Sequence, residues 1–335
     1  MRVVIVGATG DAGAALLRRL WAEADLDLVG VARRIPEPVG IRRDVEWHAI
    51  DLVAEAAADR LADVFRGADA VVNMAWRVQP SHDARRLFRT NVLGSREIAR
   101  AAVAAGVGSL VQASSVGVYS PGPKDGFVTE RYPRRGVLRS SYSRHRALVE
   151  RMLDQVGSDY PGLRVVRVRP ALIFDRTAGA RIGRTFAGRL LRHRRIPLVP
   201  AHRRLRLQAV HADDVSEAYA RILRTDVRGA FNLAADPVLD SRVFGEFFHG
   251  VRVPLPAPAL VGAAALSWWS RLQPIDAGWV HLALEAPLVA TDRAATELGW
   301  NPRRDAVAAL REMVAAVGEP RSEDPDRSGG VRHRT

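Results

Sequence analysis

The chain has 335 residues, of which 47% are hydrophobic, so it can bury a large core without covalent or metal staples. It contains no cysteine and no ligand-spaced histidine pair, which excludes disulfides and thiolate sites, predicts no metal site, and is compatible with a cytoplasmic protein. The formal net charge of +13 comes from arginine, because Lys124 is the single lysine, and without any nucleic-acid-binding pattern it predicts no nucleic-acid partner.

The first part of the chain alternates between apolar strands and amphipathic helices. The N-terminus enters a strand at once, so no signal peptide is expected. Continuous apolar runs, typical of parallel strands buried on both faces, cover 2–8, 26–32, 45–50, 70–75, 109–115 and 163–170. A 3.6-residue period predicts helices over 12–24, 57–67, 85–106 and 142–157. This alternation predicts an α/β fold with a doubly wound parallel sheet of the Rossmann type.

After about residue 175 the regular alternation ends, which indicates a second, smaller domain. We expect a dinucleotide-binding domain over 1–175, with 206–235 returning to it. A mainly helical substrate-binding domain would comprise 176–205 and 236–318. Residues 319–335 are rich in Pro, Gly, Ser and charge and are expected to form a disordered tail.

The most apolar late segment is "PALVGAAALSWW" at 258–269. It is too short to cross a bilayer. A buried helix of the second domain is favoured over a contact with a membrane surface, so no membrane partner is expected.

A glycine turn follows the first strand. The stretch "VIVGATGDAG" places Gly7, Gly10 and Gly13 between a buried strand and an amphipathic helix. The first glycine permits the tight turn, the second lets a pyrophosphate approach the backbone, and the third lets helix and strand pack closely. The backbone N–H groups of Asp11 and Ala12 would then face the anion. The turn therefore predicts a dinucleotide site.

The residues at the ends of the next two strands bear on the choice of cofactor. Arg33 and Arg34 stand where a carboxylate would bind the ribose of NAD, which favours NADP while leaving NAD open. Asp51 and Leu52 suit an adenine edge. A helix N-cap at Asp51 is an equally good interpretation.

The order and spacing of several motifs resemble the extended short-chain dehydrogenase/reductases, also called the NAD-dependent epimerase/dehydratase family. The resemblance runs from residue 1 to about 310. Its motifs are "GATGDAG" (7–13), "IDL" (50–52), "VVNMAW" (71–76), "TNVLGS" (90–95), "ASSVGVYS" (113–120), "YSRHR" (142–146), "RPALIF" (169–174), "QAVHADDV" (208–215), "FNLA" (231–234) and "DRAATELGWNP" (292–302). The cofactor-binding residues it implies are Gly7, Thr9, Gly10, Asp11, Ala12, Gly13, Arg33, Arg34, Asp51, Leu52, Met74, Ala75, Trp76, Asn91, Ala113, Tyr142, Arg146, Pro170 and Ile173.

The resemblance also implies a catalytic set. Tyr142 would be the general acid/base while a nicotinamide takes or gives a hydride. A phenol needs nearby positive charge to act near neutral pH, and residue 146 lies one helical turn away on the same face. Ser115, which fits the family pattern better than Ser114, would hydrogen-bond the substrate oxygen, and Asn91 would brace the site.

Residue 146 departs from the family pattern, which has Tyr-x-x-x-Lys where this chain has Tyr142-x-x-x-Arg146. Arginine keeps the positive charge, but it is bulkier and planar and does not readily release a proton. Two hypotheses follow: an active NAD(P)-dependent oxidoreductase or epimerase, or a catalytically weakened nucleotide-binding protein with a regulatory role.

The substrate side of the sequence is less informative. The arginine-rich segment 181–206 falls where family members hold substrate phosphates, which favours a sugar nucleotide, and a solvated basic face is the alternative. Trp76 and Arg77 could flank the nicotinamide, and an apolar ketone or secondary alcohol remains a candidate substrate. Family members often form homodimers through two long helices, which here would be 85–106 and 142–157.

Overall fold

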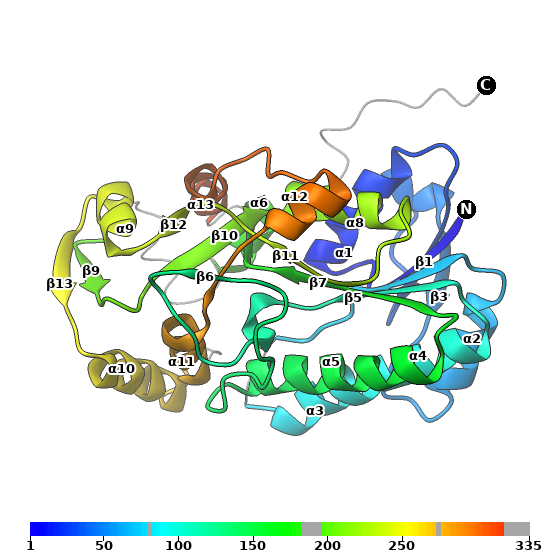
Figure 1. Ribbon diagram of the computed structural model, residues 1–335, viewed down its shortest axis with the longest axis horizontal. Helices are drawn as coiled ribbons and strands as arrows, with labels where there is room; N and C mark the ends of the chain where they lie inside the picture. The colour runs from blue at the N-terminus through cyan, green and yellow to red at the C-terminus, as the bar shows by residue number, and fades with distance from the viewer. Residues whose placement is uncertain (79–81, 183–195, 273–275, 318–335) are drawn as a thin grey trace.

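Seven parallel strands form the central sheet of the protein (Figure 1). The computed structural model describes residues 1–78, 82–182, 196–272 and 276–317. The strand order is β11-β7-β5-β4-β1-β2-β3. The strands are β1 (Arg2–Val6), β2 (Asp27–Ala32), β3 (Glu46–Ala49), β4 (Ala70–Asn73), β5 (Ser109–Ala113), β7 (Arg164–Pro170) and β11 (Gly229–Leu233). The predicted doubly wound sheet is confirmed, and its order reverses between β1 and β4, where ligands bind in such folds.

Helices cover both faces of this sheet (Figure 1). One layer consists of α1 (Asp11–Trp21), α8 (Ala212–Leu223) and α12 (Asp292–Leu298), and the other of α2 (Ala57–Phe65), α4 (Gly94–Ala104) and α5 (Ser141–Asp159). Val3 and Ile5 belong to the core of the first layer, and Val4 and Val6 to the core of the second. Successive side chains of a strand point to opposite faces, which is why each predicted strand is apolar throughout.

The predicted helix 85–106 is interrupted, so the prediction of one continuous helix was wrong. It consists of α3 (Ala84–Phe88), a π-helical turn over Arg89–Leu93, and α4. The wider turn contains the buried Asn91, whose side-chain oxygen accepts from the Arg77 N–H at 2.7 Å and whose amide donates to the Arg77 carbonyl at 2.8 Å. Turns of this kind occur frequently at functional sites.

The later part of the chain is mainly helical, as predicted, and adds small sheets. Its helices are α6 (Arg176–Ile182), α9 (Ser241–Phe248), α10 (Ala257–Trp269), α11 (Gly278–Glu285) and α13 (Ala306–Ala315). The strands β8 (Leu172–Phe174), β10 (Leu207–His211) and β12 (Ala235–Leu239) form one sheet. Two further pairs are β9 (Leu198–Ala201) with β13 (Val251–Pro254), and β6 (Phe127–Val128) with β14 (Leu288–Val289). The predicted tail 319–335 lies outside the described residues.

The segment 258–269 forms a helix as predicted, but the prediction that this helix is buried was wrong. The segment forms α10, but none of the residues of this helix is buried, and Leu266 and Trp269 are 72% and 81% exposed. Trp268 stacks on His82, with ring centroids 4.3 Å apart. A helix that is apolar on all sides has no preferred buried face, so its hydrophobic composition did not reveal which side would be covered. Among the described residues, no helix has both the length and the apolar character needed to span a membrane.

Candidate active site

The glycine turn closes tightly against the end of β4. Gly7 has a φ of +86°, and its N–H donates to the Val31 carbonyl at 2.8 Å. A Cβ added to Gly7 would lie 2.7 Å from the backbone nitrogen of Ala75, and one added to Gly13 would collide with the Gly7 carbonyl. Gly10 is the N-cap of α1, and because it has no side chain, it makes no side-chain hydrogen bond to the first helical turn, the end of a helix that favours an anion. This cradle fits the pyrophosphate of a dinucleotide.

The predicted adenosine-binding residues follow the next two strands. Arg33 and Arg34 come directly after β2 and are exposed. The pKa of Arg77 is lowered, first by burial and then by the charges of Arg86 and Arg33, so three arginines gather near this end of the sheet.

Asp51 follows β3 and is exposed, and its carboxylate accepts from the Val53 N–H at 3.2 Å. The alternative interpretation of Asp51 as a helix N-cap was wrong, because α2 begins at Ala57 with Ala56 as its N-cap. Leu52 is buried.

The remaining predicted cofactor residues belong to this same end of the sheet. Thr9 and Gly10 are exposed on the glycine turn, whereas Met74, Ala113 and Ile173 are partly buried and pack against the core that includes Ala8. Ala75 donates its N–H to the Asn73 side chain at 3.0 Å, and Pro170 is the last residue of β7.

Asn73 itself was missed by the sequence analysis. It is fully buried and also donates to Gln112 at 2.9 Å, so it fixes the backbone beside the glycine turn.

Three consecutive residues at the end of β5 face three different partners. The Ala113 carbonyl accepts from the guanidinium of Arg146, and the buried Ser114 donates its hydroxyl to Glu150 at 2.6 Å. Ser115 is half-buried, and its hydroxyl oxygen accepts from the N–H of Gly117 at 3.1 Å. Ser114 is therefore occupied by a structural contact, which leaves Ser115 as the candidate for a substrate contact.

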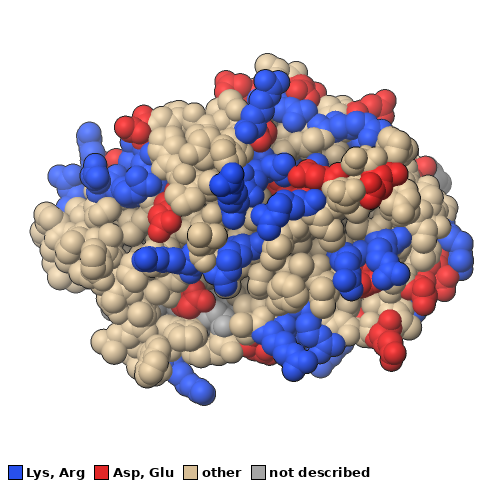
Figure 2. Space-filling model, turned by 60° about the horizontal axis from the view of Figure 1, so that its bottom comes forward, with Lys and Arg blue, Asp and Glu red and all other residues tan. Residues whose placement is uncertain are grey.

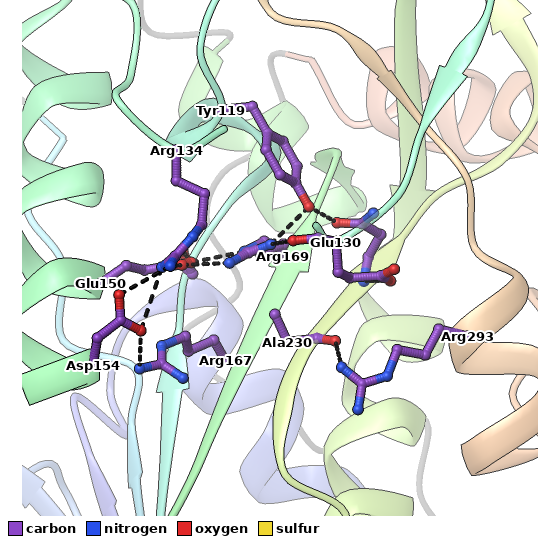
Figure 3. Close-up of polar contacts among 11 residues, drawn as sticks. Tyr119, Glu130, Arg134, Glu150, Asp154, Arg167, Arg169, Ala230 and Arg293 are labelled. Atoms are coloured by element: carbon purple, nitrogen blue, oxygen red, sulfur yellow. Dashed lines mark hydrogen bonds and ion pairs between the residues drawn. The ribbon is translucent and has the colours of Figure 1, made fainter. Parts of the chain in front are cut away.

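Glu150 is the centre of a buried polar network (Figure 3). Arg169 binds both carboxylate oxygens of Glu150, and it also donates to the Tyr119 hydroxyl at 2.8 Å. Burial would raise the pKa of Glu150, but the charge and hydrogen bonds of Arg169 outweigh it and lower that pKa. Burial raises the pKa of Tyr119 to about 12 in spite of Arg169. The network joins β7, α5 and the segment after β5 beneath the site.

Tyr142 and Arg146 lie together on α5, as their spacing predicts. The Arg146 Nε donates to the Tyr142 hydroxyl at 3.3 Å. The guanidinium carbon lies 3.5 Å from the ring centroid of Trp76, and the Trp76 and Tyr142 rings meet edge to face at 6.0 Å. Because the Gly7 turn contacts Ala75, the cradle for a pyrophosphate and the tyrosine are linked through two consecutive residues.

The sequence analysis missed the opposite wall of this site, which α11 provides. The Trp279 ring lies 4.8 Å from the Tyr142 ring. A Cβ added to Gly117 would lie 3.0 Å from the Tyr142 ring, 3.4 Å from the Ser115 hydroxyl and 3.5 Å from Leu282. The tyrosine and the serine hydroxyl therefore flank one glycine. No pattern in the sequence connects α11 with α5, since 136 intervening positions separate Trp279 from Tyr142.

The C-terminal end of α11 is held by cations that donate to backbone carbonyls. Lys124 donates to the carbonyls of Ala283 and Arg206, both at 2.8 Å, and Arg204 donates to the carbonyl of Leu284 at 2.9 Å. Positive charge stabilises this end of a helix. Burial, together with the charges of Arg204 and Arg206, lowers the pKa of Lys124 to about 7.

The predicted phosphate-binding segment 181–206 is described only in part, because residues 183–195 lie outside the described ranges. Arg204 and Arg206 each donate to backbone carbonyls, Arg206 to that of Lys124. On the face shown in Figure 2, Lys and Arg gather in several groups separated by acidic and uncharged residues. In the described part of the chain, no group of three His, Asp or Glu side chains has the arrangement of a metal site.

Comparison with known proteins defines the class to which this fold and site belong. The profile of the NAD dependent epimerase/dehydratase family matches residues 3–234. Because this match spans more than half of the sequence, the chain belongs to that family. No curated protein matches the sequence.

Solved structures similar to this chain share its whole fold. UDP-glucose 4-epimerase of Thermus thermophilus, in complex with NAD, is 21% identical with a TM-score of 0.70, over 96% of this chain and 100% of that one. The dTDP-glucose 4,6-dehydratase of Streptomyces venezuelae, with NAD bound, is 19% identical with a TM-score of 0.69, over 94% and 96% of the two chains. A UDP-glucose 4-epimerase of Stenotrophomonas maltophila, with bound NAD, is 17% identical with a TM-score of 0.70, over 95% and 98%. At these identities the likeness establishes the fold.

Proposed function

We propose that the chain is an NAD(P)-dependent oxidoreductase or epimerase that acts on a secondary alcohol or ketone, with sugar nucleotides as the first substrate class. The observation that carries this proposal is the continuity from the Gly7 turn through Ala75 and Trp76 to Arg146 and Tyr142. It brings a pyrophosphate cradle and a potential acid/base to one end of the sheet. The sugar nucleotides come from the similar solved structures, two of which hold UDP-glucose.

Each residue of the site has a separate role in the proposed reaction. A bound nicotinamide dinucleotide supplies the hydride acceptor or donor. Tyr142 takes the hydroxyl proton of the substrate during oxidation and returns it during reduction. Ser115 hydrogen-bonds the same substrate oxygen, and Arg146 stabilises negative charge on the phenol through its Nε. Trp76 and Trp279 shield the tyrosine ring on two sides.

The dinucleotide is proposed to be NADP, with NAD as the alternative. Exposed Arg33 and Arg34 stand at the end of β2, and Arg77 and Arg86 add positive charge nearby. A 2′-phosphate would be favoured by these charges. The three similar structures described above all carry NAD, so both cofactors belong in the test.

A second substrate class, an apolar ketone or alcohol, is favoured by one observation. The wall opposite Tyr142 consists of Trp279 and Leu282, and the nearby Arg204 and Arg206 donate to backbone carbonyls. The catalytically weakened alternative rests on arginine at position 146. The contact between the Arg146 Nε and the phenol favours an active enzyme.

The experiment that tests this proposal has two stages. The purified protein is denatured, any released nucleotide is identified, and the renatured or untreated protein is titrated with NADH and NADPH. It is then assayed with UDP- and dTDP-sugars and with apolar ketones. Retention of a pyridine nucleotide and turnover of one substrate class support the proposal, and failure to bind either nucleotide overturns it. Turnover that appears only after Arg146→Lys would favour the weakened binding protein.

A further inference from the structure

Arg146 occupies a fixed position although it has no carboxylate partner among the described residues. It is 7% exposed, so its charge is largely withdrawn from water. Its Nε donates to the Tyr142 hydroxyl, its Nη1 donates to the Ala113 carbonyl, and its guanidinium carbon lies over the Trp76 ring, 3.5 Å from the centroid. Three different groups therefore hold three parts of one side chain.

A lysine at this position would not use the Trp76 face in the same way. A guanidinium is planar and stacks on aromatic faces, whereas an ammonium is a compact, strongly hydrated charge on a flexible stem. Stacking restricts the guanidinium to one plane, and its donors then point in fixed directions within that plane. Among the described residues, no acceptor is found for the remaining terminal nitrogen, Nη2, of Arg146.

Trp76 is itself positioned by its surroundings. Asn91 binds both backbone groups of the next residue, Arg77, and the indole and the Tyr142 ring meet edge to face at an interplanar angle of 78°. The indole nitrogen of Trp76 is buried, and no described residue accepts a hydrogen bond from it. The ring is therefore oriented by packing and by the backbone beside it, and its face is presented to the guanidinium.

We propose that Trp76 is a positioning residue for Arg146, and that the two form a matched pair which allows arginine to serve at this position. Trp76 fixes the guanidinium plane so that Nε meets the phenol and Nη2 is directed to an oxygen of the bound dinucleotide or substrate. The inference rests on the proposed function, because it assumes that a dinucleotide binds beside Tyr142. It predicts that most of the cost of removing the Trp76 ring is seen only while residue 146 is arginine.

A double-mutant cycle on the full chain tests this prediction through the dissociation constants of NADH and NADPH. With arginine present, Trp76→Leu is expected to weaken binding of the tighter nucleotide about 10-fold, within the range of a desolvated cation–π contact. In the Arg146→Lys background the same substitution is expected to cost less than about 3-fold. Trp76→Phe keeps an aromatic face and is expected to retain binding within about 3-fold of the native chain.

Trp279→Leu is the matched control, because Trp279 also contacts the Tyr142 ring but belongs to α11. This substitution is expected to change the dissociation constant of the nucleotide by the same factor in both backgrounds. An equal cost of Trp76→Leu in both backgrounds overturns the inference, because a purely structural role would act equally with either cation. If Trp76→Leu does not fold, Trp76→Met is carried through the same cycle. A native chain that binds neither nucleotide refutes the proposed function. If the native chain binds a nucleotide but the effects of the two substitutions are additive, only the pairing of Trp76 with Arg146 is refuted.

Discussion

Among the described residues, two buried arginines, Arg169 and Arg146, each lie beside a tyrosine with similar geometry but in different surroundings. The guanidinium carbon of Arg169 lies 5.0 Å from the ring centroid of Tyr119, and that of Arg146 lies 5.2 Å from the ring centroid of Tyr142. Each arginine also donates to the hydroxyl of its tyrosine. Contact between the two residue types is therefore not what makes one of them a candidate active site.

The difference lies in what else each pair contacts. Arg169 is neutralised by Glu150, and the Tyr119 hydroxyl donates to Asn232 at 2.6 Å in a buried environment (Figure 3). Within the described ranges Arg146 contacts the face of Trp76 and no carboxylate, and Tyr142 is half-buried. The first pair has its charge and hydrogen bonds satisfied internally and stabilises the fold. The second places a buried arginine, with no carboxylate partner among the described residues, beside a half-buried hydroxyl, as the proposed acid/base role of Tyr142 requires.

The largest expected effect comes from removing the hydroxyl of Tyr142. Tyr142→Phe is expected to lower kcat about 10²–10⁴-fold, the usual contribution of a general acid/base. Nucleotide binding should change by less than about 3-fold, because the ring and Arg146 remain. Steady-state kinetics and a nucleotide titration on the same preparation check this. A variant that retains more than a tenth of native kcat would remove Tyr142 from the mechanism.

Breaking the internal pair should affect stability. Glu150→Gln leaves Arg169 buried without its carboxylate and is expected to lower the free energy of unfolding by about 3–5 kcal/mol. Asp154→Asn is the control, because Asp154 pairs with Arg134 and Arg167 but its side chain is 44% exposed, and a loss of at most about 1 kcal/mol is expected. Urea unfolding measures both. Equal losses in the two variants would show that Glu150 is not the centre of the network.

Tyr119→Phe sharpens the contrast between the two tyrosines. It removes the hydrogen bonds with Asn232 and Arg169 and is expected to lower the free energy of unfolding by about 1–3 kcal/mol. The kcat of the folded variant should stay near the native value. A loss of kcat comparable to that of Tyr142→Phe, in a protein that is still folded, would contradict the division of roles.

Lys124 provides a buried cation whose charge, unlike that of the arginines, depends on pH. Its pKa is lowered to about 7, whereas in the unfolded chain it stays near 10.5, so unfolding between these pH values takes up a proton. The free energy of unfolding should therefore rise with pH from about 7 to 10, by up to about 1.4 kcal/mol per pH unit. Lys124→Met lacks this contribution, so the native chain should gain stability relative to the variant over that range. Parallel pH profiles in urea unfolding would show that Lys124 does not titrate there.

Local sequence patterns predicted the sheet, the glycine turn and the shared face of Tyr142 and Arg146, because each depends on residues close together in the chain. The contact of Arg146 with Trp76, the wall from α11 and the pairing of Glu150 with Arg169 join distant segments, and no local period encodes them. The interruption at Asn91 was missed for the same reason, since its side chain binds Arg77. The exposure of α10 depends on what packs against it, which composition does not specify.

The central claim is that a dinucleotide lies on the glycine turn with its nicotinamide beside Tyr142. A crystal structure of the native chain with NADPH or NADH tests this most directly. The account predicts pyrophosphate oxygens at the backbone N–H groups of Asp11 and Ala12, and the nicotinamide ring next to the Tyr142 hydroxyl and Arg146. A dinucleotide bound elsewhere, or a nicotinamide ring separated from Tyr142 by Trp76 or Trp279, would contradict it.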